Sequence, residues 1–256
     1  MERPAGPQTS PPPQAPVGRT PPPPKGGGPG AWARTFESLS IPGYRWYWLG
    51  TAAAFLGMQM QWPAQSWLAY ELTGSALMLG LVSAAWGVPM FLLSLFGGAM
   101  ADRIEKRKLL VVSQLALGLL SLGLALLISF DLVKFWHLIV TAALSGTVFA
   151  FNMPARQAIV PELVPRKSLF NAIVLSSGAM NATRVLGPAV AGVLMAAIGV
   201  DGAFYASVGC TLVAVAFLLK LPATGPVRST SRRSISTDIF EGLRYIRGQP
   251  IVMVLL

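Results

Sequence analysis

The chain has 256 residues, of which 53% are hydrophobic and only 12% are charged, and its mean hydropathy is +0.57. A soluble fold of this composition would have too much apolar surface to hide, so the sequence predicts a polytopic membrane protein. The formal net charge of +10 does not indicate nucleic-acid binding, because the basic residues lie in loops beside apolar runs. With one cysteine, one histidine and no Gly-x-x-x-x-Gly-Lys-Ser/Thr loop, the sequence predicts no intrachain disulfide, metal site, cofactor or ATP-driven pump.

Residues 1–35 form a Pro- and Gly-rich segment, in which residues 1–30 hold 11 of the 21 prolines. Such a segment cannot bury enough apolar surface to offset its ordering entropy, so we predict a disordered cytoplasmic tail. It has no apolar stretch near Met1, and we therefore do not expect a cleaved signal peptide. Both a plain linker and a docking segment for a partner domain fit this composition.

The first predicted span covers about residues 46–70 and has no charged residue. It begins in an aromatic cluster that is typical of an interfacial anchor, namely Tyr44, Trp46, Tyr47 and Trp48. Pro63 lies mid-span and has no N–H, so it releases the carbonyl of Gln59 from the helix hydrogen bonds. Because polar side chains are costly in lipid, three residues are candidate substrate contacts in a water-filled cavity: Gln59, Gln61 and Gln65. Hydrogen bonds between helices explain each of them equally well.

The second and third predicted spans, about 77–101 and 109–130, are uncharged, and each exceeds the roughly 20 residues that a helix needs to cross a bilayer. The turn between them is rich in Lys and Arg, which predicts a cytoplasmic location. Its residues follow an ordered pattern, Gly98-x-x-x-Asp102-Arg103-x-x-Lys106-Arg107.

This pattern resembles the signature loop of the major facilitator superfamily, although Glu105 stands where that family usually has Gly. The resemblance implies a conformational gating loop, in which Asp102 meets the dipole of a helix in the other half of the protein. Taken singly, the basic residues of the loop are equally well explained as charges that only set the topology.

Three further apolar runs predict spans at about residues 135–153, 168–198 and 202–219, with a charged loop at 154–167. His137 near the outer end of the fourth span is expected to be an interfacial residue. In this topology 18 of the 20 Lys and Arg residues lie in cytoplasmic segments, one lies in an outer turn and one is intramembrane. That bias predicts six spans, with the N-terminus in the cytoplasm.

Arg184 lies near the centre of the fifth predicted span, where an arginine costs roughly 2.5 to 3.5 kcal/mol on insertion scales. Ser177 and Asn181 share one helical face with Arg184, and Pro188 leaves the carbonyl of Arg184 without its usual donor. We hypothesise that Arg184 binds an anionic part of the substrate or keeps a carboxylate of another half charged. A structural arginine hydrogen-bonded to helix carbonyls is the alternative.

Residues 221–249 are polar and basic, and they contain a stretch with four apolar residues on one helical face: Ile239, Phe240, Leu243 and Ile246. We predict a cytoplasmic loop with an amphipathic helix on the membrane surface. Residues 250–256 then begin a seventh apolar span. The remainder of a second half is expected either downstream of this point or in another copy of the chain.

From about Phe36 onward the chain resembles the branch of the major facilitator superfamily that contains enterobactin-exporter-like and macrolide-efflux-like permeases, the transmembrane secretion effectors. Besides the charged loop, the resemblance rests on three segments: residues 67–75, 152–165 and 241–246. Residues 184–192 also resemble the Gly-Pro segment of the superfamily's antiporters, with departures at Thr183 and Ala191. Close helix packing equally explains the small or kinking residues of this segment, Gly187, Pro188 and Gly192.

The resemblance implies an all-α membrane protein in which residues 36–220 are the six-transmembrane-helix N-terminal half of a major facilitator fold, followed by the start of a seventh helix. It also implies a missing C-terminal half and alternating access around a midplane site. The expected function is secondary active transport in the cytoplasmic membrane, namely proton-coupled export of a drug, siderophore or other small metabolite. Lipid or lysolipid translocation and a non-transporting scaffold are the alternatives, whereas no set of loop residues predicts an enzyme.

Overall fold

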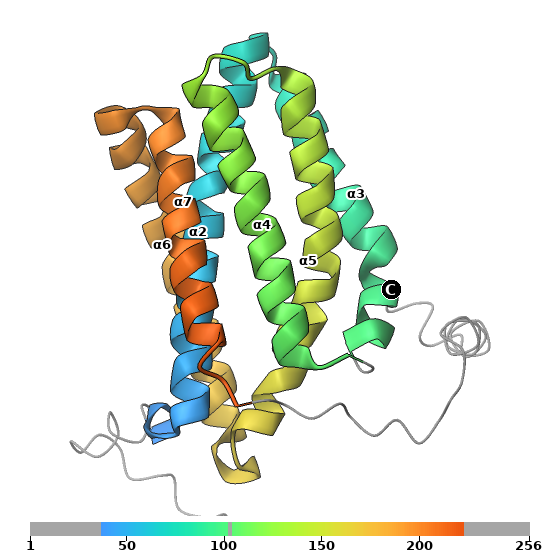
Figure 1. The fold of residues 1–256 in the computed structure, drawn as a ribbon, viewed down its shortest axis with the longest axis vertical. Helices are drawn as coiled ribbons and strands as arrows, with labels where there is room; N and C mark the ends of the chain where they lie inside the picture. Colours follow the sequence, from blue (N-terminus) through green and yellow to red (C-terminus); the bar gives the residue numbers. More distant parts are fainter. Residues whose placement is uncertain (1–36, 102–103, 223–256) are drawn as a thin grey trace, which may run out of the picture. The chain divides into compact units, whose positions relative to one another are not determined.

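The computed structural model describes residues 37–101 and 104–222, and all regular structure in these residues is helical (Figure 1). The prediction of an all-α protein is confirmed for this part of the chain. Two short 3₁₀ helices, η1 (Glu37–Ser40) and η2 (Arg166–Ser168), accompany six long helices: α2 (Pro42–Thr73), α3 (Ala76–Ala101), α4 (Lys106–Ser129), α5 (Phe135–Leu163), α6 (Leu169–Ile198) and α7 (Val200–Leu218).

Several predicted features lie outside the described residues. They are the tail at 1–35, the gating-loop residues Asp102 and Arg103, nearly all of the segment 221–249, and the start of a seventh span at 250–256. These features stay predictions.

The helices agree with the predicted spans to within four residues at every end but one. Five of them, α3 to α7, are long and apolar enough to cross a membrane by length and composition. The 32-residue helix α2 is not among these five, because the polar residues at its centre lower its hydropathy. The class of membrane protein therefore agrees with the prediction, whereas the count of six spans plus a seventh is not confirmed.

The end of the fourth span is the one boundary that was wrong. A loop was predicted from residue 154 onward, but α5 continues to Leu163 through Pro154 and Pro161. A proline inside a helix removes one backbone hydrogen bond, which packing in a bundle can offset. The charged residues of this stretch also have partners, so they do not require a solvated loop. Arg156, counted among the 18 cytoplasmic basic residues, is instead a buried residue of α5.

Helices α3 and α5 pack along each other, α2 packs on α6 and α7, and α4 packs on α5 and α7 (Figure 1). The closest approaches need residues without a side chain. A Cβ built on Gly97 of α3 would lie 2.1 Å from the carbonyl oxygen of Ala150. That oxygen is the one left without a helical donor by Pro154, so this carbonyl of α5 and the glycine in α3 fit together.

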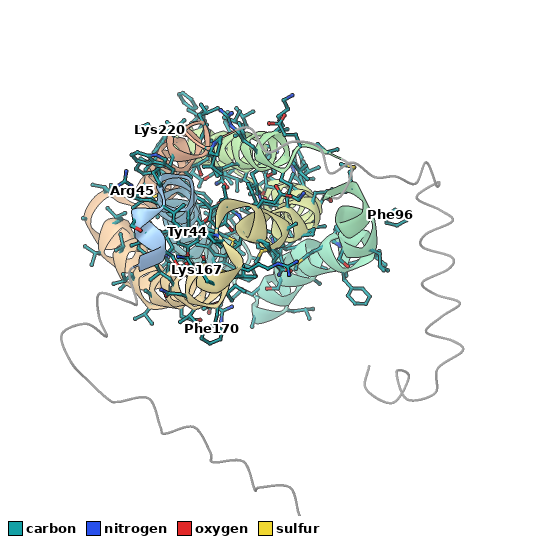
Figure 2. All side chains as sticks on the ribbon, turned by 90° about the horizontal axis from the view of Figure 1, so that it is seen from below. Tyr44, Arg45, Phe96, Lys167, Phe170 and Lys220 are labelled. Carbon is teal, nitrogen blue, oxygen red and sulfur yellow. The ribbon has the colours of Figure 1, made fainter. Side chains whose placement is uncertain are left out.

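The aromatic cluster at the start of α2 does not form the simple interfacial anchor that was predicted. Tyr44 and Tyr47 are buried, and their hydroxyls donate to the carbonyl oxygens of Ala172 in α6 (2.7 Å) and Arg156 in α5 (2.9 Å). Their spacing of three residues places both on the helix face that meets the bundle. At the same end of the bundle, Arg45 and Lys220 lie near one another at its edge (Figure 2), around the ring of Trp46.

Candidate functional site

A cavity of about 70 Å³ opens inside the bundle, between five of the described helices. A water needs about 10 to 15 Å³ of such space, so the cavity has room for several waters that solvate polar side chains. Its lining combines polar and aromatic residues from α2, α3, α4, α5 and α7, including Phe55, Gln61, Trp62, Gln65, Trp86, Gln114, Phe149, Asn152, Arg156, Ser207 and Thr211.

Arg156 is the one charged residue in this lining, and only 4% of it is exposed. Its guanidinium is held by side chains from three helices. Nε donates to Oδ1 of Asn152 (2.6 Å), Nη1 to Oγ1 of Thr51 (2.9 Å) and Nη2 to Oε1 of Gln114 (3.0 Å). The guanidinium carbon also lies 5.6 Å from the ring centre of Phe55. These contacts fix both the position and the plane of the guanidinium group.

The partners of Arg156 are themselves held in place. The amide nitrogen of Asn152 donates to Oγ of Ser113 at 2.5 Å, which turns the amide oxygen toward Arg156. The hydroxyl of Tyr47 donates to the backbone carbonyl of Arg156 and joins α2 to α5 at the same level. Support of this kind presents the guanidinium in one orientation before any ligand arrives.

Among the described residues, the hydrogen-bond partners of the Arg156 guanidinium are all neutral groups. An arginine side chain keeps its proton in proteins, and a buried charge is costly unless it is paired. Within the described part of the chain, the recorded ion pairs are Lys106 with Glu162 and Lys108 with Glu105. Neither pair includes Arg156, so this end of the cavity is electropositive.

The opposite part of the cavity is aromatic. Trp62 of α2 and Trp86 of α3 meet edge to face with ring centres 5.1 Å apart, and Phe149 of α5 lies 5.5 Å from Trp86. Thr51, which binds Arg156, precedes Trp62 by 11 residues on α2, or about 16 Å at 1.5 Å per residue. The cavity therefore presents a fixed positive charge at one end and ring surfaces toward the other.

The three predicted glutamines of α2 occupy different settings. Gln61 and Gln65 line the cavity, and Gln65 also donates to the carbonyl oxygen of Leu138 at 3.2 Å. Gln59 is not a lining residue, and it lies half-buried against α6. A Cβ on Gly187 of α6 would lie 2.3 Å from the Cβ of Gln59, so this contact is between the two helix backbones.

The predicted polar stripe of α6 lies apart from the cavity. Ser177, Asn181 and Arg184 are exposed, and so are Pro188 and Gly192 further along the helix. The face of α6 that is buried against the bundle carries small residues, namely Ala172, Thr183, Gly187 and Ala191. A substrate or coupling role for the exposed stripe stays a prediction.

The described residues of the predicted gating loop tie helix ends together. Lys106 is buried, and its Nζ lies 2.6 Å from Oε1 of Glu162 in α5. Arg107 donates through Nη2 to the carbonyl oxygen of Leu219, at the end of α7, at 2.6 Å. Gly98 is half-buried near the end of α3 and has open space around its Cα. Their role in gating also stays a prediction.

Sequence reasoning missed Arg156 because Pro154 was interpreted as the end of a span. A signal was present in the isolated polar residues of the neighbouring spans. Thr51 lies nine residues after the start of α2, Gln114 eight after the start of α4, and Arg156 seven before the end of α5. Polar residues at matching depth in two parallel helices and in a third that is antiparallel to them indicate a common partner, once α5 is known to continue.

The chain is similar to known membrane transporters. A family model described as transmembrane secretion effector, within the major facilitator superfamily, matches residues 33–256. The staphyloferrin A transporter of Staphylococcus aureus is 32% identical over 178 residues, which cover 69% of this chain and 45% of that protein. The multidrug efflux pump Tap of Mycolicibacterium fortuitum is 29% identical over 198 residues (74% and 48%). The enterobactin exporter EntS of Shigella boydii is 26% identical over 189 residues (71% and 43%). The chain spans less than half the length of these curated relatives.

Proposed function

This chain belongs to the transmembrane secretion effector family of major facilitator transporters, and we propose that it takes part in exporting a small organic compound, such as a siderophore or a drug, across the cell membrane. The family and these relatives are transporters and not enzymes. We further propose that export is coupled to proton entry and proceeds by alternating access. The N-terminus and the charged turn after α3 would then face the cytoplasm.

The observation that carries this proposal is the cavity among helices α2, α3, α4, α5 and α7. It holds Gln61, Gln65 and Arg156 inside the helix bundle, and in the proposed membrane-spanning arrangement each of these polar groups carries an insertion cost. A protein that served only as a scaffold would gain nothing from a polar cavity, whereas a carrier needs one to bind and release its cargo. A preformed cavity that combines aromatic walls with polar groups at fixed positions is typical of a small-molecule site.

The proposed mechanism needs a second six-helix unit. Relatives are about twice as long as the matched region, and the superfamily's fold places its substrate between two halves that rock against each other. We propose that α2 to α7 form one such half. The second half lies in the same polypeptide or in a separate chain.

Transport in inverted membrane vesicles tests the proposal. Vesicles from cells that produce the protein together with its second half should accumulate a siderophore or drug when their lumen is acidified. Vesicles from cells without it should not, and a protonophore should abolish the difference. Gln61→Leu, which removes a cavity amide, should lower accumulation more than Leu119→Gln on the exposed face of α4 does. No protein-dependent accumulation across a panel of both compound classes would contradict the proposal.

A further inference from the structure

Resting on that proposed function, we infer that the cavity selects an organic anion that carries an aromatic ring. Arg156 receives the acidic group of this compound, and the ring packs against Trp62, Trp86 and Phe149. Carboxylate, sulfonate and phosphate groups share the oxygen geometry that a guanidinium binds through two parallel hydrogen bonds. The ring surfaces add stacking or edge contacts at centroid distances of about 4.5 to 7 Å.

A comparison with the other buried cation supports the assignment of an anion. Lys106 is 3% exposed, and a carboxylate lies 2.6 Å from its Nζ, so its charge is neutralised within the chain. Arg156 is buried to the same degree, yet its recorded side-chain partners are an amide, a hydroxyl and a second amide. Among the described residues it is thus the buried cation whose charge is not met by an acid. It also lines the cavity, so an anion there can reach it.

The lining also indicates the shape and polarity of the rest of the ligand. Trp62, Trp86 and Phe149 form a continuous row of rings from three different helices, with centre-to-centre distances of 5.1 and 5.5 Å. Gln61, Gln65 and Ser66 lie beside Trp62 on α2, and their amide and hydroxyl groups can hydrogen-bond to polar substituents of the ligand. The arrangement suits a planar acid with hydroxyl or carbonyl groups better than it suits a cation or a saturated chain.

The experiment measures binding of three related probes to the purified protein in lipid nanodiscs. Radiolabelled 2-naphthoate has both the acid and the rings, 2-naphthamide keeps the rings but lacks the charge, and cyclohexanecarboxylate keeps the charge but has a smaller body without aromatic surface. We expect the wild type to bind 2-naphthoate at least about tenfold more tightly than either other probe, a ratio set by one charged contact. Equal binding of naphthoate and naphthamide would overturn the inference, even in a protein that transports siderophores or drugs in vesicles.

Four variants locate the effect. Arg156→Gln should lose most of the preference for naphthoate over naphthamide, and Arg156→Lys should keep part of it. Arg166→Gln removes the same charge from an exposed residue outside the cavity and should keep the full preference. Trp62→Leu should weaken naphthoate several-fold and leave cyclohexanecarboxylate unchanged. An unaltered preference in Arg156→Gln would overturn the inference, and should that variant fail to fold, the wild-type ratio decides alone.

Discussion

The cavity and the outer face of α6 both carry an arginine among polar side chains, but the two arginines meet opposite surroundings. Arg156 is enclosed by α2, α4 and α5 and held by Thr51, Gln114 and Asn152. Arg184 is exposed on α6, on the face where Ser177 and Asn181 also stand, and none of the described residues hydrogen-bonds to its guanidinium. The described helices supply hydrogen-bond partners for the guanidinium of Arg156. The guanidinium of Arg184 has to find its partners outside these helices.

The difference shows how a helical bundle can use polar residues in two ways. Inside the bundle, side chains of neighbouring helices replace water and hold a charge where a ligand can reach it. On the outer face, an arginine in mid-helix has to meet lipid headgroups, water or another protein surface, because hydrocarbon offers no acceptor. We therefore expect the exposed stripe of α6 to face the second half, and the following predictions test this contrast.

The largest effect is expected from a side chain at Gly187, where α6 meets α2. A Cβ there would lie 2.3 Å from the Cβ and 3.0 Å from the backbone carbon of Gln59, so Gly187→Val must push the helices apart. We expect loss of most folded protein from the membrane, measured by fluorescence-detected size-exclusion chromatography. Gly192→Val is the matched control, because its Cβ would meet no atom within 4 Å and the residue is exposed. Equal amounts of both variants would contradict the packing that separates the two faces of α6.

An intermediate effect is expected at Arg184. Arg184→Gln removes the charge from an exposed side chain, so the amount and thermal stability of the protein should stay near those of wild type. If the stripe faces the second half or the substrate, transport in vesicles should fall several-fold, and Arg184→Lys should restore part of it. Wild-type transport by Arg184→Gln would assign the residue to the lipid interface. Loss of abundance without a change in transport per molecule would instead support a structural role.

Much of the fold could be predicted from the sequence, because hydrophobic run length decides where helices cross a membrane. The long apolar runs located α3, α4, α6 and α7, and the family resemblance was correct. The end of α5 could not be predicted, since a proline followed by an arginine fits a loop as well as a buried helix. What distinguishes them is the set of partners on α2 and α4, and these are known only once the helices are placed beside one another.

The candidate site was predicted only in part for the same reason. Gln61 and Gln65 were chosen because they are polar in an apolar span, and they do line the cavity. Gln59 met the same criterion but lies against Gly187, because a helix turns by about 100° per residue and neighbouring positions face different helices. Arg184 was chosen for its charge. Intramembrane charges are expected to face away from lipid, but this rule does not say whether such a residue faces the interior of one half or the interface between two halves.

The smallest effect, and the sharpest comparison, is expected from two tyrosines at the start of α2. Tyr47→Phe removes the hydroxyl that donates to the Arg156 carbonyl at 2.9 Å, whereas Tyr44→Phe removes the one that donates to the Ala172 carbonyl of α6 at 2.7 Å. Both rings are buried and both variants keep them, so Tyr47→Phe should lower the free energy of unfolding by only about 0.5 to 1.5 kcal/mol, the net contribution of one hydrogen bond. Tyr44→Phe should lower it by up to about twice as much, because the Tyr44 hydroxyl also hydrogen-bonds to Oγ of Ser176 at 2.9 Å. Their effects on ligand binding should differ, because only Tyr47 contacts the residue that carries the charge of the cavity. We expect Tyr47→Phe to weaken 2-naphthoate binding a few-fold and Tyr44→Phe to leave it unchanged, with thermal unfolding of both variants measured in the same nanodiscs.

Similar binding by the two variants would mean that the backbone contact from Tyr47 does not help to position Arg156, and that the guanidinium is held by Asn152, Thr51 and Gln114 alone.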